Sequence, residues 1–90
     1  MTNREITVIM ENYLAKVGKA EVLKLLAEEA SGLASAALKL SRTPEKDICT
    51  RRTALDAINR AVSNLEILEI MLDVYPSDGY QTEMLEVMKV

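Results

Sequence analysis

The fold is decided by the stretch from Pro44 to Tyr75, PEKDICTRRTALDAINRAVSNLEILEIMLDVY, in which no Gly or Pro follows the first residue. Apolar side chains recur along it at steps of three, four and seven residues, the spacing of one helix face. A helix of about 32 residues would be roughly 48 Å long, whereas a compact chain of this size has a diameter of roughly 30 Å. We therefore expect this helix to pack against a second copy of the chain.

The apolar surface of this predicted helix is broader than one stripe. Ile67, Ile70, Met71 and Val74 flank the main row, and a helix that is apolar over so wide a face needs more than one packing partner. We expect a dimer or a higher even-numbered oligomer. The predicted oligomer interface consists of three residues of the main row, Leu65, Leu68 and Leu72.

Two shorter segments before this stretch also read as helices. Thr2 and Glu5 have the spacing of a capping box, which opens a helix, and Gly18 is a typical helix terminator. A second helix is predicted from about Lys19 to Arg42. Most residues in its middle, 32–37, have small side chains, which permit close approach of another helix.

The remaining boundaries follow from turn residues. Thr43 and Pro44 suit the N-cap and first position of the third helix. The turn at residues 77–79 precedes a short fourth helix, whose Met84 and Met88 are expected to pack against the third. The sequence thus predicts a single all-α domain, residues 1–90. Its expected architecture is a small antiparallel bundle of three main helices plus a short C-terminal helix.

Composition restricts the function classes. The net charge of −3 and the pI near 4.9 argue against general nucleic-acid binding, which requires a basic surface. Without histidine, the chain has no imidazole for catalysis or metal binding. The lone Cys49 permits no internal disulfide and indicates a reducing compartment. The first residues resemble no leader segment and no apolar run has the length of a membrane span, so we expect a cytoplasmic protein without membrane contact.

One acidic pair is a candidate metal site. Glu28 and Glu29 lie in the middle of the second predicted helix. Adjacent acids are a common feature of solvated helix faces. A Mg²⁺ site in a helical bundle requires further carboxylates converging from another helix.

The stretch Glu28-Glu29-Ala30-Ser31-Gly32-Leu33 resembles the first motif of the MazG-like all-α nucleoside triphosphate pyrophosphohydrolases, Glu-Glu-x-x-Glu-Leu. Residues 60–68, RAVSNLEIL, fall where that family carries Glu-Glu-x-x-Asp and an apolar run. The resemblance covers about residues 20–75. It implies a helical scaffold, Mg²⁺ as cofactor and nucleotides as substrates, and it suggests a phage or prophage factor that acts on a host system.

Most of the implied metal ligands are replaced. Gly32 stands at the third acidic position, Arg60 and Ala61 at the second pair, and Asn64 at the aspartate. An arginine repels a divalent cation, so the implied reaction is expected to be absent. Arg60 and Asn64 are the candidate ligand-binding residues, since a guanidinium can meet phosphate directly. The alternative is that Arg60 is exposed or pairs with Asp56.

Three functions remain open. The first is a non-catalytic interaction or nucleotide-binding protein on a pyrophosphohydrolase-like scaffold, with a host protein or a nucleotide as partner and no cofactor. The second is a residual Mg²⁺-dependent pyrophosphohydrolase that uses Glu28 and Glu29. The third is an unrelated helical adaptor.

Overall fold

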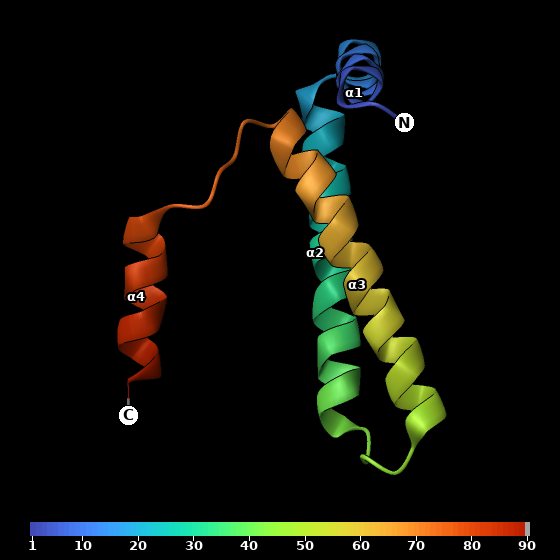
Figure 1. Ribbon diagram of the computed structural model, residues 1–90, viewed down its shortest axis with the longest axis vertical. Helices are drawn as coiled ribbons and strands as arrows, with labels where there is room; N and C mark the ends of the chain where they lie inside the picture. Colours follow the sequence, from blue (N-terminus) through green and yellow to red (C-terminus); the bar gives the residue numbers. More distant parts are fainter. Residues whose placement is uncertain (90) are drawn as a thin grey trace.

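The computed structural model describes residues 1–89, which form four α-helices and no strand within that range. They are α1 (Asn3–Val17), α2 (Lys19–Arg42), α3 (Ile48–Met71) and α4 (Asp78–Met88). The all-α prediction is confirmed. Figure 1 shows α2 and α3 as a long antiparallel hairpin, with α1 across its open end and α4 apart from the rest.

The hairpin is built from two rows of residues spaced by alternating steps of three and four. On α3 the row contains buried Ala54, Ala61 and Leu68 with half-buried residues between them. On α2 it runs from buried Val22 to buried Ala36. This is the spacing of a coiled-coil seam, and its alanines let the two backbones approach closely. The segment of small side chains in the middle of α2 therefore packs against α3 through Ala36.

A cluster of buried apolar residues lies at the open end of the hairpin. Val22, Leu68 and Met71 form a buried cluster there. Partly buried apolar residues of α1, α2 and the end of α3 surround it: Met10, Leu14, Val17, Leu25, Leu26 and Leu72. In Figure 1, α1 is seen nearly along its axis while α2 and α3 run lengthwise, so α1 crosses the hairpin instead of extending alongside it.

The predicted boundaries of the first two helices are close to those observed. The Thr2 hydroxyl accepts a hydrogen bond from the Glu5 backbone N–H at 3.2 Å and caps α1. Gly18 ends α1, and its N–H donates to the Leu14 carbonyl at 2.8 Å. Its φ of +83° with ψ of 162° is a conformation open essentially to glycine alone.

The predicted start of the third helix is wrong. Asp47, and not Thr43, is the N-cap of α3, and its carboxylate accepts from the Thr50 N–H at 3.2 Å. The Thr43 hydroxyl instead donates to the Lys39 carbonyl at 2.7 Å and so belongs to the end of α2. Pro44 lies in the connecting turn, which the Asp47 N–H closes by donating to the Pro44 carbonyl at 3.0 Å.

The predicted end of the third helix is also wrong, because α3 stops at Met71 instead of Tyr75. Asp73 has a φ of +56°. The Val74 N–H donates to the Glu69 carbonyl at 3.0 Å and the Asp73 N–H to Ile70 at 3.2 Å, which together make a Schellman motif. The helix has 24 residues and a length of about 36 Å, so its length no longer argues for a partner.

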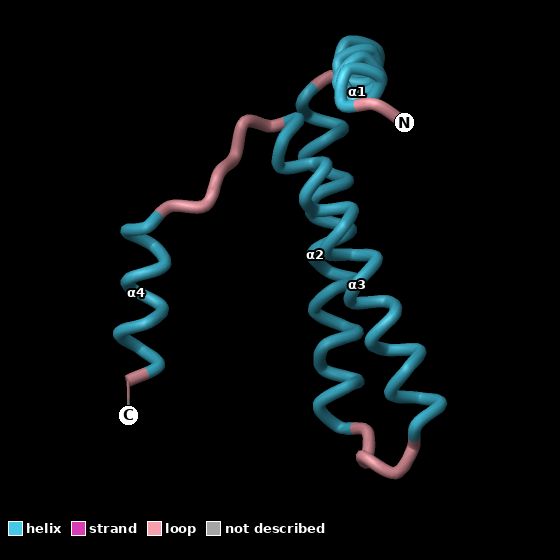
Figure 2. The backbone as a smooth tube through the Cα atoms, in the orientation of Figure 1, coloured by secondary structure: helices cyan, strands magenta, loops and turns pink. Residues whose placement is uncertain are grey.

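The fourth helix contacts none of the other three within the described residues. Figure 2 shows the loop that carries it away from the end of α3. Met84 and Met88 are 57% and 62% exposed, so the prediction that they pack against the third helix is wrong.

The chain is extended for its size. Its radius of gyration is 16.3 Å, against about 12 Å for a compact chain of this length. None of the helices in residues 1–89 has the combination of length and apolar character that crossing a membrane demands.

Candidate functional site

The predicted acidic pair is split between two sides of α2. Glu29 is half-buried and belongs to the row that faces α3, whereas Glu28 is exposed. Adjacent helical residues point about 100° apart, so the two carboxylates diverge. Gly32, one turn further on, is also exposed.

The corresponding positions of α3 are divided in the same way. Ala61 is buried in the hairpin seam, while Arg60 and Asn64 are exposed. Together with Asn59 and Ser63 they line a shallow depression on the outer side of α3. The structure therefore brings Arg60 and Asn64 together, but on a surface that Glu29 does not face.

Glu28, Glu29 and Arg60 take part in no salt bridge within the described residues. Within residues 1–89 the salt bridges are Lys24–Glu21 and Lys89–Glu86, so the alternative pairing of Arg60 with Asp56 is not formed. In the same range no three Asp, Glu, Cys or His side chains converge as a metal site. Two diverging carboxylates on one helix, opposite an alanine, do not fit the oxygen-rich shell that Mg²⁺ requires.

The residues of the predicted oligomer interface lie mostly inside the chain. Leu68 is buried with Val22 and Met71, Leu72 packs against that cluster, and Leu65 is half-buried. These leucines stabilise the hairpin itself. The large apolar residues that remain free on α3 are displaced around the helix from them.

Large apolar side chains are exposed on all four helices of the described chain. On α3 they include Ile48, Leu55, Val62 and Ile70, which are between 46% and 64% exposed. The α1 helix adds Val8, Ile9 and Tyr13, and α4 adds Tyr80, Met84, Leu85, Val87 and Met88. Those that lie on one side of α3 form the candidate interaction surface.

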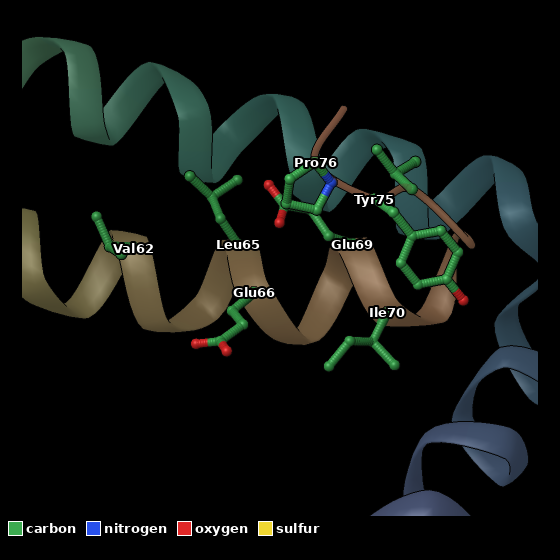
Figure 3. A pocket seen from close by; sticks show the side chains of 8 residues that line it. Val62, Leu65, Glu66, Glu69, Ile70, Tyr75 and Pro76 are labelled. Atoms are coloured by element: carbon green, nitrogen blue, oxygen red, sulfur yellow. The ribbon is translucent and has the colours of Figure 1, made fainter. Parts of the chain in front are cut away.

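A groove runs along the C-terminal half of α3. Its lining is largely apolar, with Val62, Ile70 and the loop residues Val74, Tyr75 and Pro76, and it contains the acids Glu66 and Glu69. Figure 3 shows Leu65 directed toward α2, whereas Glu66 and Ile70 point away from it. The groove and the free side of α3 are thus continuous.

One ionisable group in this groove has a perturbed pKa. The Tyr75 phenol donates a hydrogen bond to Asp73 Oδ1 at 3.2 Å. This bond favours the neutral phenol, and the carboxylate charge opposes the phenolate, so the pKa of Tyr75 is raised above its ordinary value of 10.0. The Tyr75 side chain is exposed.

Sequence reasoning placed the oligomer interface on Leu65, Leu68 and Leu72, which the structure packs within the hairpin, and therefore did not single out the exposed side of α3. The signal was present in Ala54 and Ala61, which are seven residues apart and mark the side of closest helix contact. Comparison with known proteins adds no further information: no family model, curated protein or solved structure matches this chain.

Proposed function

We propose that this chain is a non-catalytic helical interaction protein that works as a self-assembled dimer or higher even-numbered oligomer. The observation that carries the proposal is the exposed area. The chain has a solvent-accessible surface of 7364 Å², whereas a compact monomer of 10.0 kDa exposes about 5,200 Å². The excess of roughly 2,000 Å² is more than the ~800 Å² that each partner buries in an interface of standard size.

The small core supports the same proposal. Val22 is the only large side chain in residues 1–89 that is fully buried, and much of the remaining core consists of alanines. Alanine burial contributes little hydrophobic free energy, because the contribution scales with the apolar area removed from water. A partner that covers the free apolar surface would supply the missing burial.

The fourth helix provides an independent argument. It has 11 residues and no contact with the other helices of the described chain. Isolated helices shorter than about 12–15 residues are marginal in water, so a packing partner is needed to hold α4 in helical form. In an assembly, α1 and α4 would complete the bundle of which the α2–α3 hairpin is the centre.

We assign no reaction to Glu28 and Glu29. We take the resemblance to the MazG-like enzymes as a resemblance of the helical scaffold alone. No observation favours a nucleotide over a protein as ligand. The depression beside Arg60 and Asn64 is shallow and solvated, whereas the apolar surface is extensive. Protein association is therefore the function that the geometry supports best.

Sedimentation velocity and light scattering test the proposal. We expect a mass of twice or four times 10.0 kDa at micromolar concentration, and a melting temperature that rises with protein concentration because assembly stabilises the fold. A stable helical monomer, with a melting temperature independent of concentration, would refute self-assembly.

A further inference from the structure

The free side of α3 carries an ordered row of residues. The row advances by steps of four and three residues, as in a coiled-coil seam. It consists of Ile48, Arg52, Leu55, Asn59, Val62 and Glu66, and it ends near Ile70. Each of these residues is exposed. From Arg52 to Glu66 the row lies one position after the row that packs on α2, so it is turned about 100° around the helix.

The row is nearly symmetric about Asn59. Moving outward from Asn59 in either direction, one meets an apolar residue, then a charged residue, then an apolar residue. The charged residues have opposite signs, Arg52 on one side and Glu66 on the other. Both are seven residues from Asn59.

We propose that this row is the seam of an antiparallel two-fold dimer, in which α3 packs against α3 of a second copy with Asn59 at the centre. The proposal rests on the self-assembly proposed above and specifies its geometry. In this register Arg52 lies opposite Glu66 of the second copy, twice in the dimer. Ile48 lies opposite Ile70 of the second copy, and Leu55 lies beside Val62 of the second copy.

Charge selects this orientation. A parallel pair would place Arg52 against Arg52 and Glu66 against Glu66, so like charges would meet at both positions. The antiparallel pair replaces both repulsions by attractions and also aligns the helix dipoles favourably. Such pairs act mainly on partner choice and orientation, while the four apolar residues provide the burial.

The centre of the seam selects the register. A buried amide requires hydrogen-bond partners, and in this register each Asn59 has the Asn59 amide of the second copy opposite it. A two-fold axis at Asn59 brings the two amides together and makes the interface isologous. The α4 helix does not cover this side, because it contacts no other helix of the described chain (Figure 1).

Charge reversal tests the pairing. Arg52→Glu and Glu66→Arg should each weaken the dimer at least tenfold, because each brings like charges together twice. An equimolar mixture of the two variants should recover the dimer, since both pairs become complementary in the mixed species. The double variant Arg52→Glu/Glu66→Arg should also recover it. Arg4→Glu, an equal change at an exposed position of α1, is the matched control and should leave the dimer intact.

Cysteine cross-linking tests the orientation. Asn59→Cys in a Cys49→Ser background should form a disulfide-linked dimer on mild oxidation, because the two positions meet at the axis. Native Cys49 is exposed and lies ten residues from Asn59. In the antiparallel pair it would be about 30 Å along the axis from its counterpart, so the native chain should not cross-link. Cross-linking of the native chain through Cys49 would bring together two positions that this register separates by about 30 Å, and would overturn the proposal.

The results separate this proposal from the proposed function. A wild-type chain that is monomeric would overturn both. A wild-type oligomer that is insensitive to both charge reversals, and in which Asn59→Cys fails to cross-link, would overturn the seam and leave self-assembly through another face. At a protein concentration at which a variant still dimerises, its circular dichroism should show wild-type helix content, since all substituted positions are exposed.

Discussion

Arg51 holds the turn between α2 and α3 by donating a hydrogen bond from Nη1 to the Thr43 carbonyl at 2.9 Å. The same nitrogen approaches the Leu40 carbonyl at 3.5 Å. The last carbonyls of a helix have no partner within the helix, and a cation beside them also interacts favourably with the helix dipole. The side chain is half-buried, so it is a structural element of the hairpin.

Replacing Arg51 by Ala should therefore destabilise the fold by about 1–2 kcal/mol, because hydrogen bonds from a charged donor are lost. Thermal unfolding at fixed protein concentration measures the change, and a domain of this size shifts by about 4–8 °C per kcal/mol. The control is Arg60→Ala, an exposed arginine on the same helix. Equal effects of the two substitutions would contradict a specific role for Arg51.

The chain offers two glycines at which Ala should have opposite effects. Gly18 has a φ of +83°, so Gly18→Ala should cost about 1–3 kcal/mol of stability through backbone strain. Gly32 lies in mid-helix, and an added Cβ meets no atom within 4 Å. Gly32→Ala should therefore stabilise the fold by about 1 kcal/mol through helix propensity. Urea unfolding of both variants checks the signs, and a loss of stability in both would mean that Gly32 is needed for packing.

These residues show which parts of the fold the sequence could predict. The ends of α1 depend on Thr2 and Gly18, whose roles are local and common, and they were predicted. The start of α3 was predicted with Thr43 as its cap, whereas the structure caps it with Asp47. Thr43 does not cap α3 because its hydroxyl donates back to the Lys39 carbonyl at the end of α2.

The end of α3 could not be predicted because Asp73 occupies the left-handed position that glycine usually takes. Absence of Gly and Pro before Pro76 was therefore a poor guide to helix length. The predicted oligomer interface, Leu65, Leu68 and Leu72, lies on the packed side of α3 for a different reason. The periodicity of large apolar residues treats Leu68 and Val62 equally, although one is buried and the other exposed; only the small residues Ala54 and Ala61 mark the packed side in the sequence.

The hydrogen bond from Tyr75 to Asp73 predicts a titration. It raises the pKa of Tyr75, so its contribution is complete below the ordinary phenol pKa near 10 and disappears as the pH rises through the raised value. Asp73→Gly removes the carboxylate while it preserves the left-handed φ at the helix end. This variant should lower the pKa of Tyr75 toward its ordinary value.

Carbon-13 labelling at tyrosine Cζ, with Tyr75→Phe used to assign the resonance, measures this pKa by NMR. The labelled ring of Tyr75 should titrate at lower pH in the Asp73→Gly variant than in the wild type. Identical titration of Tyr75 in the two proteins would show that the hydrogen bond to Asp73 is not populated in solution.

The last prediction concerns catalysis. We expect no hydrolysis of nucleoside triphosphates with Mg²⁺ or Mn²⁺ at the rates of about 1–10³ s⁻¹ usual for enzymes. Glu29 faces the hairpin seam while Glu28, Arg60 and Asn64 face solvent, so residues 1–89 assemble no carboxylate shell to hold a metal, activate water and stabilise the leaving pyrophosphate. Pyrophosphate release and Mg²⁺ calorimetry measure this directly, and Glu28→Gln should change neither. Turnover at an ordinary enzyme rate that is abolished by Glu28→Gln would restore the pyrophosphohydrolase as the function of this protein.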